Sequence, residues 1–182
     1  MENNTSKKFI ILLHGPMGSG KTTTSKRLHE IIVPSARVAL PDMRRLISGN
    51  HREHGEITRN VMLDMARTYL KQNIPVVVET VCGEGYIKEY ADLALKNECL
   101  FLPYHINADE SIRWDRVCER TRLMMDLPEL PLEKEEELKP IFAENKTFYD
   151  KQEGNIGNLL DTSNLTTDEV ISQILSDLNY GN

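Results

Sequence analysis

The sequence predicts an α/β fold in which one parallel sheet of five strands is covered by helices on both faces. Short, continuously apolar runs rich in β-branched residues recur along the chain, and segments with helical spacing separate them. A strand that is apolar all round must be buried on both faces, which is the condition of a strand between two helix layers. The chain has 182 residues, a length that suits a single domain covering residues 1–182.

Five short segments are expected to form the strands of this sheet. They are, in chain order, residues 9–13, 36–40, 76–78, 100–106 and 156–162. The fourth segment contains Pro103, which has no N–H to give to a neighbouring strand, so we expect this strand at an edge or with an irregularity. In a parallel sheet, ligands bind outside the carboxyl ends of the strands, so functional side chains are sought there.

Helices are expected between the strands and after the last one. They are predicted at residues 21–32, 56–73 and 84–97, then from about Asp109, up to about Gln152, and from Thr166 onward. Thr166 and Glu169 have the spacing of a capping box, which marks the start of the last helix. Residues 122–140 contain three prolines and an acidic run, so we expect this stretch to be polar and mobile.

Composition argues against several classes of protein. The formal net charge is −6 and the pI is about 5.4, so the chain lacks the overall basic character that nucleic-acid binding favours. Its three cysteines are far apart and lack CxxC spacing, which argues against a disulfide framework or a zinc site. No apolar stretch reaches the length of a membrane span, and no secretion signal is recognisable. We therefore expect a cytoplasmic protein without a membrane partner.

A glycine-rich loop directly follows the first predicted strand and opens the first predicted helix. Its pattern, Gly15-x-x-x-x-Gly20-Lys21-Thr22, is that of a phosphate-binding P-loop. Glycines let backbone N–H groups approach phosphate oxygens, and the following helix N-terminus adds positive dipole. Lys21 is expected to bridge the terminal phosphates, and the Thr22 hydroxyl to hold Mg²⁺. The residues expected to bind the nucleotide phosphates are Gly15, Met17, Gly18, Ser19, Gly20, Lys21, Thr22 and Thr23.

Two charged residues follow the second predicted strand, in the stretch "PDMRR". Asp42 falls at the carboxyl edge of the sheet beside the phosphate loop, where a carboxylate can orient and deprotonate a hydroxyl that faces the γ-phosphate. Arg45 lies three residues further on, on the same helical face, and can pin an anionic group of the acceptor. An alternative role for Asp42 is that of a helix cap, which is compatible with the first role.

Two further polar residues, Glu79 and Thr80, end the third predicted strand. A carboxylate at this strand end suits a contact to Mg²⁺ through water or a hydrogen bond to the acceptor. Asp42 is the other carboxylate that is placed to reach the metal through water. The alternative for Glu79 is a capping or surface role.

Three arginines, Arg116, Arg120 and Arg122, precede the proline-rich acidic stretch. Arg116 and Arg120 are four residues apart and share one helical face. The arrangement is typical of a lid, here at about residues 116–140, whose arginines close over the nucleotide and neutralise charge that develops during phosphoryl transfer. The alternative is a solvated basic face of a helix.

The segment of about residues 43–73 is expected to bind the acceptor. It is locally basic within an acidic chain, which suits a phosphorylated or nucleotide acceptor, whereas ordinary helix-surface charge is the alternative. Its basic side chains are Arg44, Arg45, Arg52, Arg59, Arg67 and Lys71, with His51 and His54.

The order of these motifs resembles that of the P-loop kinases of the nucleoside-kinase-like group. The stretches that carry the resemblance are "GPMGSGKTT", "PDMRR", "VVVET", "DRVCERTR" and "LLDTSNLTTDEVISQIL", which together span nearly the whole chain. The likeness is closer to small kinases such as the polynucleotide 5′-kinase domain, gluconate kinase, chloramphenicol phosphotransferase and zeta toxin. It implies a three-layer P-loop NTPase fold with strand order 2-3-1-4-5, and ATP with Mg²⁺ as the phosphate donor. It also implies that Asp42 is the catalytic base and Arg45 a contact to the acceptor.

The resemblance implies further roles for residues near the nucleotide. Arg116 would stack on the adenine, and Arg120 or Arg122 would reach the phosphates. The turn of residues 161–163, after the fifth strand, would lie near the adenine.

We therefore expect an ATP- and Mg²⁺-dependent kinase that transfers the γ-phosphate to a hydroxyl of a small molecule, of nucleoside, sugar or antibiotic type. One alternative keeps the chemistry and changes the acceptor to the 5′-hydroxyl of a nucleic acid or to a nucleotide-sugar. Another is a nucleotide-binding regulator without catalysis that acts through a protein partner. The sequence leaves open the acceptor, the choice between ATP and GTP, and whether the protein is a monomer or a dimer.

Overall fold

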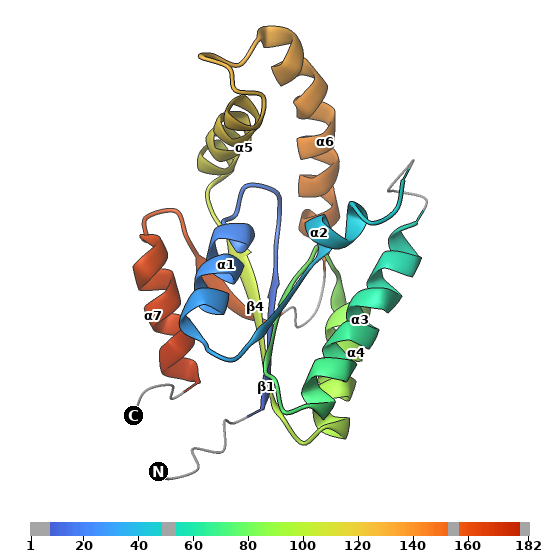
Figure 1. The fold of residues 1–182 in the computed structure, drawn as a ribbon. Helices are drawn as coiled ribbons and strands as arrows, with labels where there is room; N and C mark the ends of the chain where they lie inside the picture. The colour runs from blue at the N-terminus through green and yellow to red at the C-terminus, as the bar shows by residue number, and fades with distance from the viewer. Residues whose placement is uncertain (1–7, 49–53, 153–156, 179–182) are drawn as a thin grey trace.

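The computed structural model describes residues 8–48, 54–152 and 157–178, and its sheet has the predicted architecture (Figure 1). Five parallel strands lie in the order β2-β3-β1-β4-β5. The strands are β1 (Phe9–His14), β2 (Ala36–Ala39), β3 (Val76–Glu79), β4 (Leu100–Asn107) and β5 (Asn158–Asp161). The predicted fold class, and the strand order that the resemblance implied, are therefore confirmed. His51 and Arg52 of the predicted acceptor segment lie outside the described residues.

The helices form two layers over the sheet and a pair of helices above its carboxyl edge. They are α1 (Lys21–Ile31), α2 (Leu40–Arg44), α3 (Gly55–Lys71), α4 (Glu84–Lys96), α5 (Glu110–Met124), α6 (Leu132–Asp150) and α7 (Thr167–Asp177). In Figure 1, α1 and α7 lie on one face and α3 and α4 on the other, while α5 and α6 rise above the edge where the strands end. None of the helices in the described ranges is long and apolar enough to cross a membrane.

The core consists of one apolar cluster on each face of the sheet. Alternate residues of β1 point to opposite faces, so Ile10 and Leu12 pack under α3 and α4, while Ile11 and Leu13 pack under α1 and α7. All four side chains are completely buried. This burial on both faces explains why the strand reads as one continuous apolar run.

The strand that contains Pro103, β4, is an internal strand between β1 and β5, so the expected edge position is wrong, whereas the alternative, an irregularity, is present. Its pairing with β5 begins only at Tyr104, so Pro103 has β1 alone as a neighbour and its missing N–H costs no bond to β5. The capping box of α7 is present: Thr166 Oγ1 accepts from Glu169 N–H, and Glu169 Oε2 accepts from Thr166 N–H at 2.8 Å.

The acidic stretch expected to be mobile is helical from Leu132 onward. Acidic residues in the first turn of α6 favour the helix because they lie at the positive end of its dipole. Ion pairs three residues apart, such as Lys134 with Glu137, add local support. Pro140 lies inside α6 and removes one helical hydrogen bond without ending the helix.

Candidate active site

The phosphate loop runs between β1 and α1. At two of its positions the backbone of a neighbouring element lies so close that only glycine fits. A Cβ atom on Gly15 would lie 1.9 Å from Ile106 O, and one on Gly18 would lie 2.3 Å from Arg113 O. Both glycines also have positive φ, 144° and 81°. The loop is therefore pressed against β4 and the start of α5, and its path requires glycine at Gly15, which the motif specifies, and at Gly18, which it does not.

Lys21 is the first residue of α1, and its side chain folds back over the loop. Its Nζ donates to Pro16 O at 2.8 Å and lies 3.4 Å from Ser19 Oγ. Burial lowers the pKa of Lys21 to about 8; Glu79 opposes this shift and Arg120 adds to it. An anion bound in the loop would compensate the cost of burying the Lys21 ammonium and its repulsion by Arg120. The electrostatics of the loop therefore favour a phosphate.

Glu79 ends β3 and is buried beside the first turn of α1. Parallel pairing places Glu79 opposite Leu13, directly before the phosphate loop. Its Oε1 accepts a hydrogen bond from Thr22 Oγ1, and its Oε2 accepts one from Ser25 Oγ at 2.7 Å. Arg37 Nη2 donates to the same Oε2 at 2.6 Å. Only 2% of the Glu79 side chain is exposed, and these three donors compensate its buried charge.

Thr22 and Glu79 together fit a Mg²⁺ ion. Mg²⁺ takes oxygen ligands, keeps several waters and commonly uses one or two carboxylates together with substrate phosphates. The hydroxyl of Thr22 and the carboxylate of Glu79 supply such oxygens in direct contact, and both residues line the cleft above the loop. The described residues contain no group of three or more His, Cys, Asp or Glu that could hold a metal. A Mg²⁺ ion here would therefore take most of its ligands from phosphates and water.

Arg37 is a member of this network that the sequence analysis missed. It lies on β2, is 13% exposed, and donates Nε to Ser25 Oγ at 2.8 Å and Nη2 to Glu79. Its Nη1 donates to Asp42 Oδ2 at 2.6 Å, so one guanidinium joins the two predicted carboxylates. The available signal was a single charge within the apolar run "ARVAL", since a charge in a buried strand needs a partner.

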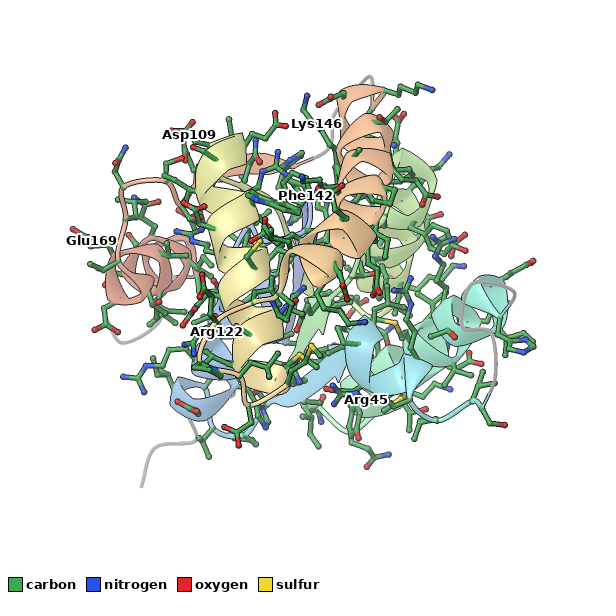
Figure 2. All side chains as sticks on the ribbon, turned by 90° about the horizontal axis from the view of Figure 1, so that it is seen from above. Arg45, Asp109, Arg122, Phe142, Lys146 and Glu169 are labelled. Atoms are coloured by element: carbon green, nitrogen blue, oxygen red, sulfur yellow. The ribbon has the colours of Figure 1, made fainter. Side chains whose placement is uncertain are left out.

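The other residues predicted to contact the acceptor lie outside the lining of the cleft. Asp42 lies in α2, is 46% exposed, and is held by Arg37. Arg45 follows α2 and is exposed (Figure 2). Thr80 is buried, and its N–H donates to Leu13 O at 3.0 Å, which extends the pairing of β3 with β1. Among the described residues, the lining of the cleft includes Pro41 but not Asp42, Arg45 or Thr80.

A cleft of about 1330 Å³ opens above the carboxyl edge of the sheet. The phosphate loop and the C-terminal halves of α5 and α6 face it, and Figure 2 shows these two helices side by side over the sheet with Phe142 between them. One side, which we call the α7 side, is lined by Arg116, Thr162, Leu165, Thr167 and Val170. The opposite side, the α3 side, includes Arg44, Glu56, Arg59, Ile141, Glu144 and Phe148.

The three predicted lid arginines have three different environments. Arg116 Nη1 donates to Thr162 Oγ1 at 3.0 Å and Nη2 to Thr162 O at 2.9 Å, which ties α5 to the turn after β5. Arg120 lines the cleft and makes no ion pair or hydrogen bond with another residue of the described ranges. Arg122 lies near the end of α5, pairs with Glu119 at 2.6 Å, and does not line the described cleft. The structure thus directs Arg120 to the cleft, and not Arg122.

The sequence matches one known protein family over most of its length. The sequence matches the model of the AAA domain family AAA_33 over residues 10–140, so the chain belongs to this family of P-loop proteins. This match includes the phosphate loop, the Glu79 network and the three arginines predicted to belong to the lid. Among curated protein sequences, none matches this chain significantly.

Solved structures share the fold at low sequence identity. A tunicamycin resistance protein of Deinococcus radiodurans has a TM-score of 0.63 and 19% identity, with 94% of this chain and 96% of that chain covered. The APS kinase CysC of Mycobacterium tuberculosis, solved with AMPPNP and APS, has a TM-score of 0.60 and 12% identity, with 95% and 98% covered. A sugar kinase of Janibacter sp. has a TM-score of 0.58 and 12% identity, with 96% of each chain covered. The fold is therefore that of P-loop kinases.

Proposed function

We propose that this protein is an ATP- and Mg²⁺-dependent kinase that transfers the γ-phosphate of ATP to a hydroxyl of a small-molecule acceptor. The observation that carries the proposal is the contact of Thr22 with Glu79 beside Lys21, on a loop that faces a cleft with two differently built sides. Nucleotide binding requires only the loop and one side. A second side beyond the terminal phosphate provides the room for an acceptor that a kinase needs.

The residues on the donor side have distinct roles in this proposal. Lys21 and those loop N–H groups that have no acceptor among the described residues hold the β- and γ-phosphates, and Arg120 reaches them from α5. Thr22 and Glu79 hold Mg²⁺, which when bound neutralises charge on the phosphates. Arg116, fixed on the turn after β5, lies on the side where the base of the nucleotide would be bound.

Asp42 is the carboxylate that we propose for orienting the acceptor hydroxyl; it does not itself line the described cleft but directly follows Pro41, which does. Arg37 holds it at 2.6 Å and links it to Glu79, so its position is coupled to the metal site. A carboxylate paired with arginine is a weaker base, but phosphoryl transfer passes through a loose transition state in which little proton transfer is needed early. Orientation of the hydroxyl is then the main contribution of Asp42.

The α3 side fits a small acceptor with polar and apolar parts. Apolar Ile141 and Phe148 stand beside the charged Arg59, Glu56 and Glu144. Arg44 and Arg59 balance the two carboxylates, so this side lacks the net positive charge that binding of a polynucleotide favours, which supports a small molecule as the acceptor. Two proteins of the same fold are named as kinases of small molecules, APS and a sugar.

The test is ATP consumption with Mg²⁺ against a panel of nucleosides, sugars, nucleotide-sugars, antibiotics and a 5′-hydroxyl oligonucleotide. One acceptor should stimulate turnover, and Asp42→Asn should lower kcat by roughly 10²-fold while ATP binding persists. Asp92→Asn, an exposed aspartate on α4, is the matched control and should behave as the unchanged protein. ATP binding without stimulation by any acceptor would instead favour the regulator with a protein partner.

A further inference from the structure

Helix α6 reaches from the lid into the phosphate loop through two side chains. Asn145 Oδ1 accepts a hydrogen bond from Met17 N–H at 2.6 Å, and the Tyr149 hydroxyl accepts one from Gly15 N–H at 2.9 Å. Asn145 and Tyr149 are four residues apart, so they lie one above the other on the same face of α6. Their partners are two residues apart in the loop. One helical turn therefore bridges the first half of the phosphate loop.

Tyr149 anchors this contact in the body of the protein. It is 8% exposed, and its ring lies 5.4 Å from that of His105 on β4 and 6.2 Å from that of His14 on β1. Burial raises the pKa of Tyr149, although the backbone amides of Gly15 and Cys82 act in the opposite direction. The neutral hydroxyl thus joins α6 to the phosphate loop.

The N–H groups of the loop divide into two sets. Those of Gly15, Met17 and Ser19 have acceptors within the protein, the last being Pro16 O at 3.3 Å. In the described part of the chain, the N–H groups of Gly18 and Gly20 have none. The loop therefore uses the N–H groups of Gly15, Met17 and Ser19 for its own support and leaves those of Gly18 and Gly20 to phosphate oxygens.

The same helix also lines the α3 side of the cleft and contacts the lid. Ile141, Glu144 and Phe148 of α6 line the cleft together with Asn145. The Phe142 ring packs on Trp114 of α5, with ring centroids 5.2 Å apart (Figure 2). A molecule seated against α6 therefore contacts the element that holds the phosphate loop.

We propose that Asn145 and Tyr149 are positioning residues for phosphoryl transfer. They hold the phosphate loop at a fixed position relative to a molecule bound against α6. This inference rests on the proposed kinase function. Neither side chain is assigned to a phosphate or to the acceptor. Their loss should therefore misplace the γ-phosphate relative to the acceptor and lower kcat, while the affinity for the nucleotide changes little.

The test compares Asn145→Leu, which has nearly the same size but no acceptor oxygen, with Thr147→Val. Thr147 is exposed on the same helix, so this control makes a similar change of polarity away from the loop. Asn145→Leu should lower kcat roughly tenfold and change the Kd of Mg-AMPPNP less than threefold. Tyr149→Phe, which removes only the hydroxyl, should act in the same direction.

Amide hydrogen exchange of the same proteins gives a readout that does not need an acceptor. The Met17 amide should exchange at least roughly tenfold faster in Asn145→Leu than in Thr147→Val, while the Ile11 amide in β1 stays unchanged. Equal Met17 exchange and equal kcat in the two variants would overturn the inference. A protein that transfers phosphate to no acceptor would refute the kinase function, and the exchange of Met17 would then still decide whether α6 holds the loop.

Discussion

The phosphate loop and the α3 side of the cleft are built in different ways. The phosphate loop is made from consecutive residues whose backbone N–H groups, glycines and one lysine recognise an anion. The α3 side is made from side chains of α2, α3 and α6, which lie about a hundred residues apart in the chain. Recognition by backbone has a local pattern that can be read from the sequence, whereas recognition by dispersed side chains becomes visible only in the fold.

The largest effect should come from the phosphate loop, with Lys21→Ala. Lys21 folds over the loop, and in the proposed mechanism it is the cation that holds the terminal phosphates. We expect kcat/KM to fall by roughly 10³-fold. Lys26→Ala, an exposed lysine on the same helix, is the control and should leave steady-state kinetics unchanged. A fall of less than tenfold for Lys21→Ala would remove the lysine from the reaction.

Glu79→Gln should have the second-largest effect on the rate. It tests whether the carboxylate helps to bind a metal ion. The amide keeps the shape of the side chain and loses the charge that faces Thr22 and Arg37. We expect kcat to fall by roughly 10²-fold and the Mg²⁺ concentration for half-maximal rate to rise. Thermal unfolding of the variant separates this from lost stability. An unchanged Mg²⁺ dependence in a folded variant would contradict the metal role.

Arg59→Gln tests whether the α3 side of the cleft binds the acceptor. The Arg59 guanidinium lies 4.4 Å above the Tyr86 ring, lines the cleft and has no carboxylate within ion-pair distance in the described residues. We expect the KM for the acceptor to rise roughly tenfold, with the KM for ATP unchanged. Arg67→Gln, two turns further along α3 and paired with Asp64, is the matched control. A rise in the KM for ATP alone would place Arg59 on the nucleotide side.

A pH dependence of nucleotide binding is expected in addition, and it is small near neutral pH. The pKa of Lys21 is lowered to about 8 in the free protein, and bound phosphates favour the ammonium and raise it. ATP affinity should therefore be constant below about pH 8 and fall above it, by up to about tenfold per pH unit. Isothermal titration between pH 7 and about 9.5 measures this slope. Lys21→Arg, whose guanidinium does not titrate in this range, should bind with a flat profile; a slope that persists there would assign it elsewhere.

The sequence predicted the parts of the site whose signal is local. The loop around Gly15, the carboxylate that ends β3 and the order of the strands all follow from short patterns and from the resemblance. The contacts made by Arg37, Asn145 and Tyr149 could not be predicted, because each depends on a partner far away in the chain. The sequence also gave no rule for choosing between Arg120 and Arg122. The direction of α5 places Arg120, and not Arg122, in the lining of the cleft.

The extent of α6 was missed for a related reason. Prolines and an acidic run are read locally as irregular chain, yet the acidic residues lie at the helix N-terminus and Phe142 packs on α5. Tertiary contacts of this kind stabilise a helix more than intrinsic propensity does. The same contacts bring α6 to the phosphate loop.

The measurement that tests the central claim most directly is mass spectrometry of the acceptor panel after incubation with ATP and Mg²⁺. The account predicts that one small molecule gains a single phosphoryl group with the unchanged protein and gains none with Lys21→Ala. Acceptors that all stay unmodified while the protein binds Mg-ATP would contradict the claim that this cleft transfers phosphate to a hydroxyl.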